Sequence, residues 1–222
     1  MDILLYLLVL IVPLIAQVNI SSTYAKYKVK ANSKKMCGQE VARAVLYANG
    51  LDRVHIVEVH GNLTDHYDPK HKVVRLSTEI FHGESVAAMA VAAHECGHAI
   101  QDKEGYSWMR LRTAICPIVN LLTYSAYIMF FISLFLQMVD MLLVAIVVVL
   151  FGLVFQIVTL PVEFNASSRA MEELKKISLV DKKDSDGIYK TLKAAAYTYV
   201  AAVLSSLLNL LRLIMIFNDR RD

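Results

Sequence analysis

The sequence predicts a mainly α-helical membrane protein that combines about four transmembrane helices with a small cytoplasmic α+β domain containing a short β-sheet. The first observation behind this prediction is composition, because 56% of the 222 residues are hydrophobic and the mean hydropathy is +0.47. Soluble domains usually contain about 45–50% apolar residues. The second observation is that four apolar stretches approach the roughly 20 residues that a helix needs to cross a bilayer. The third is a polar segment, residues 21–113, with helical and strand-like patterns of its own.

Residues 1–20 are expected to form an N-terminal transmembrane anchor. The apolar run from Ile3 to Ile20 follows Met1-Asp2, without a preceding lysine or a small-residue cleavage site. A secretory signal peptide usually has both features. A retained anchor is therefore the main expectation, and a cleaved signal peptide is the alternative.

Residues 114–162 are expected to form a transmembrane hairpin. One span should run from Ile115 to Met138 and the next from Met141 to Val162. Because only a very short link separates these two helices, they should be antiparallel.

Residues 194–222 are expected to form a C-terminal membrane helix and tail. This span is the weakest of the four, because Asn209 and Arg212 interrupt its apolar run. Arg212 lies near the end, where a long side chain can extend to the membrane interface. A buried or interfacial helix is the alternative here.

The distribution of basic residues predicts the orientation in the membrane, because cytoplasmic loops are enriched in lysine and arginine. If every segment spans, the basic residues next to the spans share one side, which should be the cytoplasm, with the N-terminus outside. These residues are Lys26, Lys28, Lys30, Lys34, Lys35, Arg110, Arg112, Arg169, Lys175, Lys176, Lys182, Lys183, Lys190 and Lys193. Arg220 and Arg221 argue mildly for the opposite orientation. The lysines adjoin apolar segments rather than forming an aromatic-laced basic face, so the sequence argues against a nucleic-acid partner.

Two polar portions should therefore share the cytoplasmic side, namely residues 21–113 and a helix and loop over residues 163–193. Within the first portion, Gln39–Ala48 has apolar residues at helical spacing and is closed by an Asn-Gly pair. Two strands are expected, Val54–Val59 and Lys72–Leu76, separated by the turn-rich residues 61–69. Residues 85–102 are rich in alanine, lack proline and are predicted to form a helix.

This last helix carries the motif His94-Glu95-Cys96-Gly97-His98. Residues four apart lie on one helix face, so the two histidines can bind one metal ion through neutral imidazole nitrogens, which zinc prefers. Glu95 can then act as general base on a zinc-bound water. Gly97 should leave room beside the ion, and Cys96 should be a small buried residue. A structural histidine pair, or one that binds haem, is the alternative.

A catalytic zinc usually has three protein ligands, so a third must come from elsewhere. A further histidine, as in the extended metzincin motif, is missing after residue 102. Glu163 is the main candidate because it follows the third span and Pro161, which can begin a helix. Glu172 and Glu173 compete with it, and Glu163 could instead be an ordinary interfacial acid.

The runs "LTDHYDPKHKVVRLSTEIFHGESVAAMAVAAHECGHAIQD" and "LPVEFNASSRA" resemble the YugP-type bacterial membrane zinc metallopeptidases. More distantly, the order of parts is similar to the HtpX-type membrane gluzincins. The resemblance covers nearly the whole chain. It implies a zincin-like cytoplasmic domain in a multi-pass protein of the bacterial cell membrane. It also implies one Zn²⁺ per chain, held by His94, His98 and Glu163, with Glu95 as the base.

In the HtpX-type enzymes the distal helix reads Glu-x-x-Ala-Asp, and the aspartate braces a ligand histidine. Here the sequence is Glu163-Phe164-Asn165-Ala166-Ser167, so serine replaces that aspartate. A serine hydroxyl can still hydrogen-bond an imidazole, although it supplies no charge. The residues expected to support the ligands are therefore Ser167, Asn165 and Asp102, which lies one turn beyond His98.

The resemblance implies hydrolysis of peptide bonds by a zinc metalloendopeptidase at the cytoplasmic membrane surface. The expected substrates are polypeptides, namely membrane proteins or membrane-proximal segments, and an oligomer or an accessory membrane partner is compatible with the sequence. The strand with Val73, Val74 and Arg75 is expected to bind substrate at a sheet edge. The candidates for stabilising the transition state are His66, Tyr67, Tyr189 and Arg169, although His66 with Asp65 and Asp68 could simply form a polar hairpin loop.

Two other functions are compatible with the sequence. One is an intramembrane protease with zinc inside the bilayer, which the alanine-rich helix permits, although no Asn-Pro-Asp-Gly ligand segment follows it. The other is a metal-binding membrane scaffold without enzymatic activity.

Overall fold

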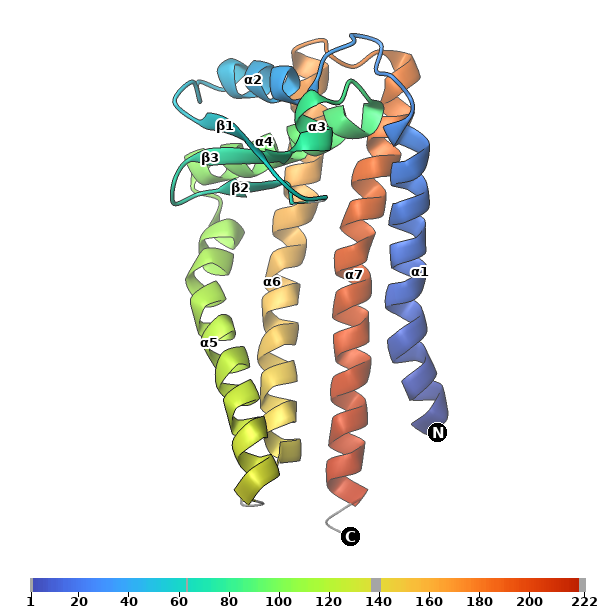
Figure 1. The fold of residues 1–222 in the computed structure, drawn as a ribbon, viewed down its shortest axis with the longest axis vertical. Helices are drawn as coiled ribbons and strands as arrows, with labels where there is room; N and C mark the ends of the chain where they lie inside the picture. Colours follow the sequence, from blue (N-terminus) through green and yellow to red (C-terminus); the bar gives the residue numbers. More distant parts are fainter. Residues whose placement is uncertain (1, 63, 137–140, 220–222) are drawn as a thin grey trace.

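A computed structural model describes residues 2–62, 64–136 and 141–219, and it is mainly helical with one small sheet (Figure 1). Its elements in chain order are α1 (Asp2–Lys28), α2 (Gly38–Ala48), β1 (His55–Val59), β2 (His66–Asp68), β3 (Val73–Ser77), α3 (Thr78–His82), α4 (Val86–Glu104), α5 (Ser107–Leu136), α6 (Met141–Lys176) and α7 (Lys182–Asp219). The helix predicted over Gln39–Ala48 is confirmed as α2, and the one over residues 85–102 as α4. The short helix α3 was not predicted.

The four long helices stand side by side in the order α5, α6, α7, α1, and the sheet with α2, α3 and α4 lies at one end of them (Figure 1). Both chain termini lie at the opposite end (Figure 1). Three of the described helices are long and apolar enough to cross a membrane: Ile3–Lys28, Met141–Lys176 and Lys182–Asp219. The C-terminal segment, which seemed the weakest in sequence, is thus among them. The expected span from Ile115 forms most of α5, but its end at Met138 lies outside the described residues.

Helix α6 is continuous through Pro161, so the expectation that a new helix begins at this proline is wrong. Proline is tolerated inside membrane helices because neighbouring groups compensate for the missing hydrogen bond. Helix α7 likewise begins at Lys182, well before the expected start at residue 194. The expected cytoplasmic segment 163–193 therefore consists mainly of the extensions of two long apolar helices.

The sheet has the strand order β1-β3-β2, with β1 parallel and β2 antiparallel to β3. The predicted turn at residues 61–69 contains the strand β2. Its sequence, His-Tyr-Asp, is too short and polar to be recognised as a strand. The assignment of Val73, Val74 and Arg75 to a substrate-binding edge is wrong, because β3 is the central strand. Val74, for example, is paired with Ile56 on one side and with Tyr67 on the other, so its backbone has no free edge. The edges belong to β1 and β2.

Helix α4 lies at the centre of the domain. The hydroxyl of Ser85 accepts a hydrogen bond from the Ala88 amide at its start, and Gly105 ends it in the left-handed conformation, with φ 65°. Fourteen of its nineteen residues are buried, and it contacts α2, α6, α7 and the sheet. Alanine on all sides permits this dense packing, because small side chains let neighbouring elements approach closely. The alanine content of α4 is therefore explained by packing inside the protein.

Candidate metal centre

Three potential zinc ligands meet where α4 packs against α6. One ligand atom from each of His94, His98 and Glu163 can be chosen so that all three lie within 4.8 Å of one another. The Glu163 Oε2 atom lies 3.3 Å from His94 Nε2 and 3.6 Å from His98 Nε2. Tetrahedral zinc ligands, each about 2.0–2.2 Å from the ion, lie about 3.3–3.6 Å apart. Both carboxylate–imidazole separations match this spacing, and the donor set of two imidazoles and one carboxylate suits a zinc ion with a fourth position left for exchange.

A glycine sets the approach of the two helices. A Cβ atom added to Gly97 would lie only 2.6 Å from the carbonyl oxygen of Ala166. The space that the sequence suggested beside the ion is therefore filled by the backbone of α6. This close contact brings Glu163, one turn before Ala166, up to the histidine pair.

Each ligand histidine has a partner on its other ring nitrogen. His98 Nδ1 lies 3.0 Å from Gln101 Oε1, while the Gln101 amide donates to Val162 O (2.8 Å) and to Asn165 Oδ1 (2.9 Å). Because both donor bonds fix the glutamine orientation, its oxygen accepts from His98 Nδ1–H, and the Nε2 lone pair is left for a metal. Ser167 Oγ lies 3.2 Å from His94 Nδ1 and orients that ring in the same way.

The structure brings two of the three expected supporting residues to the site. Ser167 contacts a ligand directly, and Asn165 supports it through Gln101. Asp102 is not a brace, because its carboxylate accepts hydrogen bonds from the Tyr67 hydroxyl and from Lys72. Proximity to His98 along the helix suggested Asp102, but its side chain extends towards the sheet.

Of the four candidates for transition-state stabilisation, His66 and Tyr67 line the larger cavity at the metal centre, whereas Tyr189 and Arg169 line neither cavity. The Arg169 guanidinium is engaged by Asn165 and Glu104, each 2.7 Å away. Tyr189 does not line either cavity at the metal centre, and the Tyr67 hydroxyl is occupied by Asp102. His66 lines the larger of the two cavities, but its Nδ1 lies 2.8 Å from Thr64 O. Among the described residues, therefore, none of these four side chains has a free hydrogen-bond donor next to the metal ligands.

The competing ligands are also excluded from the cluster. Glu172 accepts a hydrogen bond from Ser168 at 2.8 Å, and Glu173 is engaged by Asn49 and Lys176. Cys96 is fully buried, with its sulfur 3.6 Å from the carbonyl oxygen of Ala42. The expectation that Cys96 packs rather than ligates is confirmed for its position in the structure.

Glu95 lies beside this cluster and is only 8% exposed. Burial raises the pKa of its carboxyl to about 7, with the charges of Glu163 and Asp65 acting in the same direction. The charge of His94 and the backbone amide of Tyr67 lower this pKa in part. A carboxyl that titrates near neutrality can both accept and donate a proton, as a general acid–base residue must.

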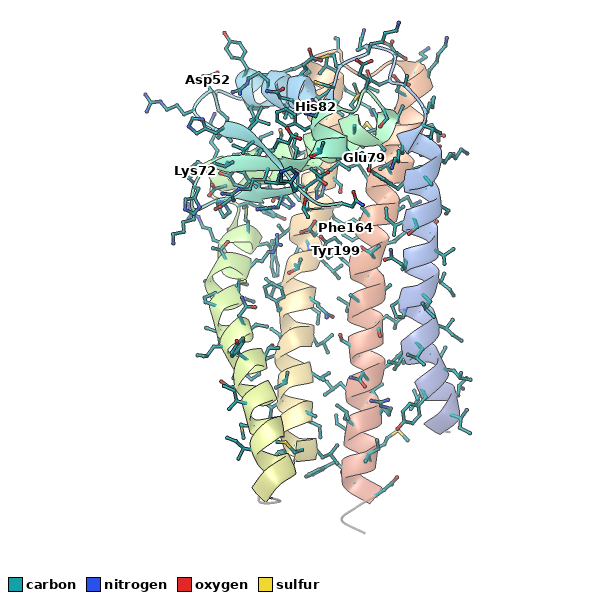
Figure 2. The ribbon with its side chains drawn as sticks, in the orientation of Figure 1. Asp52, Lys72, Glu79, His82, Phe164 and Tyr199 are labelled. Carbon is teal, nitrogen blue, oxygen red and sulfur yellow. The ribbon has the colours of Figure 1, made fainter. Side chains whose placement is uncertain are left out.

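Two cavities meet at the metal centre, and both are lined by Asp65, His94, Glu95, Glu163 and Tyr199. The smaller has a volume of about 160 Å³ and extends between α6 and α7, past Ser167 and Thr191. The larger, of about 510 Å³, extends along α5 from Met109 to Asn120. Tyr199 lies at the level where α6 and α7 meet the domain (Figure 2).

Sequence reasoning missed three residues of this site, which are Gln101, Arg112 and Tyr199. Arg112 Nη1 lies 3.2 Å from Glu163 Oε1, and its guanidinium also lines the larger cavity. The position of Gln101, three residues after His98, is a signal that could have identified it. Tyr199 and Arg112 carry no such signal, because only the packing of α5 and α7 against α6 brings them to the ligands.

Comparison with known proteins agrees with this geometry. Residues 2–218 match the model of a family described as "Putative neutral zinc metallopeptidase". The chain is 44% identical over 208 residues to the "Putative membrane protease YugP" of Bacillus subtilis (strain 168), covering 93% of this chain and 92% of that protein. No solved structure matches the chain. On the strength of a match over almost its entire length, the chain belongs to the neutral zinc metallopeptidase family.

Proposed function

We propose that this chain is a membrane-embedded zinc metalloendopeptidase of the gluzincin type, which hydrolyses peptide bonds at the cytoplasmic surface of the bacterial cell membrane. The observation that carries the proposal is the convergence of His94, His98 and Glu163 on one point, with the buried Glu95 beside them and two cavities leading to it. One zinc ion per chain fits these ligands.

Zinc, when bound, would polarise the substrate carbonyl and make water acidic enough to be deprotonated near neutral pH. Glu95 accepts the proton of the attacking water and then donates it to the leaving amine. Its pKa near neutrality supports both steps. Tyr199 and Arg112 lie beside the same cavities and are the side chains best placed to donate hydrogen bonds to the developing oxyanion. Arg112 also holds the second oxygen of the Glu163 carboxylate.

The position of Glu163 supports action at the membrane surface. It belongs to α6, one of the three helices that could span a membrane, and α6 continues from this residue into the domain. If α5 spans as well, all four long helices cross in the order seen in Figure 1. The concentration of lysine and arginine at the domain end supports a cytoplasmic active site and external termini.

The shape of the larger cavity supports membrane proteins as substrates. From Arg112 to Asn120 the cavity follows α5 for eight residues, about 12 Å of helix rise. It therefore descends from the catalytic groups towards the apolar part of the long helices. The edge strand β2 lines the same cavity through His66 and Tyr67, where an extended chain could pair with it. A membrane-proximal segment can fill this path with one end still in the bilayer. An oligomer or an accessory membrane protein could present such a segment.

Zinc content and peptidase activity of Glu95→Gln test the chemistry. The variant should bind zinc stoichiometrically, because residue 95 is not a ligand, and should lose cleavage of a quenched fluorescent peptide library by at least about a hundredfold. Wild-type protein without activity in lipid nanodiscs would favour a metal-binding scaffold. An unchanged rate in Glu95→Gln would exclude Glu95 as the base.

Depth in the membrane separates surface cleavage from intramembrane cleavage. In a Cys37→Ser/Cys116→Ser background, the exposed Asp52 of the domain (Figure 2) is replaced by cysteine and treated with an impermeant maleimide. Labelling is expected only in inside-out vesicles, whereas Ile3→Cys at the other end should label only in right-side-out vesicles. Labelling of Asp52→Cys in right-side-out vesicles would refute the proposed orientation. Protection of Asp52→Cys from both sides would support a site within the bilayer.

A further inference from the structure

A groove between α6 and α7 adjoins the smaller catalytic cavity, with which it shares Ser167, Leu192 and Ala196. Its volume is about 580 Å³, within the usual range for small-molecule sites. Its lining includes Phe164, Glu172 and Lys175 of α6 and Tyr189, Lys193 and Tyr197 of α7. We propose that this groove binds the phosphate headgroup of an anionic phospholipid, whose acyl chains lie along the apolar faces of the two helices.

The two lysines of the groove are available to an anion. Within the described part of the chain, neither Lys175 nor Lys193 forms a salt bridge, whereas their neighbours do. Lys176 pairs with Glu173, and Lys190 pairs with Asp186 at 2.7 Å. The groove carries a net positive charge because its two lysines outnumber Glu172, whose carboxylate accepts a hydrogen bond from the Ser168 hydroxyl.

Two tyrosines hold one of these lysines in place. Lys193 Nζ lies 5.5 Å from the ring centroids of both Tyr189 and Tyr197. The ammonium group also hydrogen-bonds the side chains of these two tyrosines, so it is held in place and loses less conformational entropy when it binds an anion. This arrangement favours a phosphate oxygen as the ligand.

The level of the groove suits a headgroup. Phe164 and Tyr197 are both 44% exposed, and aromatic residues concentrate where a membrane meets water. Trp108 at the start of α5 lies near the same level, since Tyr106, two residues earlier, donates a hydrogen bond to the Pro161 carbonyl of α6 at 3.4 Å. Figure 2 labels Phe164 and Tyr199 at a similar height, just beneath the domain.

Apolar surfaces continue from the groove in the direction of the spans. On α7, the exposed Val200 and Leu204 follow Tyr197 on the same face, and on α6 the exposed Ile157 precedes Phe164 by two turns. A ligand with a charged head and long apolar tails matches a basic groove that is followed along both helices by exposed apolar side chains. A soluble phosphate compound would use only the polar part.

Retention of lipid by the full-length protein tests the proposal without using peptidase activity. Purified wild-type protein is incubated with dioleoylphosphatidylglycerol or with dioleoylphosphatidylcholine, and bound lipid is measured by native mass spectrometry. The phosphatidylglycerol adduct should dominate. The Lys175→Gln/Lys193→Gln variant should bind it at least about tenfold more weakly, because both lysines attract the anionic headgroup.

The matched control is Lys176→Gln/Lys190→Gln, which removes the same charge from the same helices outside the groove. This control should retain phosphatidylglycerol like the wild type, and neither pair should alter zinc content. If both double variants lost phosphatidylglycerol binding equally, the lipid would be attracted by the general surface charge, and the proposed binding site would be wrong. Equal retention of the two lipids, or displacement of phosphatidylglycerol by millimolar glycerol 3-phosphate, would also overturn it.

Discussion

Gln101 accepts a hydrogen bond from His98 and ties that histidine to the helix that supplies Glu163. Its oxygen lies 3.0 Å from His98 Nδ1, and its amide donates to the Val162 carbonyl of α6. One buried side chain therefore fixes both the tautomer of a ligand and the distance between two ligand-bearing helices.

Gln101→Leu should lower zinc affinity about 10–100-fold, the usual effect of removing the hydrogen-bond partner of a ligand histidine. Competition with a chromogenic chelator measures this affinity. Asp102→Asn is the matched control on the next residue and should leave zinc affinity unchanged, because Asp102 contacts Tyr67 and Lys72 instead. Equal effects of the two substitutions would contradict the role given to Gln101.

Glu163→Gln should reduce zinc content far below one ion per chain, since an amide is a poor replacement for a carboxylate ligand. Glu172→Gln changes an acid on the same helix that lies outside the cluster, and it should keep full zinc content. Metal analysis by plasma mass spectrometry gives the comparison. Stoichiometric zinc with unaltered affinity in Glu163→Gln would remove this residue from the ligand set.

Gly97→Ala should separate α4 from α6. The added methyl group would lie 2.6 Å from the Ala166 carbonyl oxygen, and overpacking of this kind costs about 1–3 kcal/mol. The variant should melt at lower temperature and bind zinc more weakly. Gly152→Ala in α6 has no heavy atom within 4 Å of the new Cβ in the described structure, so it should be neutral or slightly stabilising. A fully stable, zinc-binding Gly97→Ala would refute the close contact.

The buried Glu95 should make the metal-free protein less stable as the pH rises. Its pKa is raised from 4.5 in the unfolded chain to about 7 in the fold, so the folded state binds the proton more tightly. This contribution to stability is fully present below pH 4.5 and is lost between pH 4.5 and about 7, by about 3 kcal/mol. Glu95→Gln has no such loss. Without zinc, its melting temperature should exceed that of the wild type at pH 8 but not at pH 4.5, and parallel pH profiles would contradict the assignment.

Tyr199→Phe should lower kcat about 10²–10³-fold if the hydroxyl stabilises the oxyanion, with little change in zinc content. Tyr197→Phe removes a hydroxyl from the same helix outside the two catalytic cavities, so it should leave kcat unchanged. Steady-state kinetics on a cleaved peptide separate kcat from KM. A change confined to KM would indicate ordinary substrate binding by Tyr199.

Local patterns in the sequence were sufficient for the helix with His94 and His98, because two ligands one turn apart on one helix define their own geometry. The hydroxyl of Ser167 was also expected to reach an imidazole, and it does. The central position of β3 could not be foreseen, since β2 consists of three residues with polar character and is recognisable only by its backbone pairing. Arg112 and Tyr199 were hidden for a related reason: they reach the site through packing between helices distant in sequence.

Glu163 lies on the continuous helix α6, which follows α5 in the chain, whereas the histidine pair lies on α4 and precedes both of these helices. During synthesis, the ribosome therefore releases two ligands long before the third. Until α6 has emerged and packed against α4, the nascent chain holds an incomplete set of these three candidate ligands.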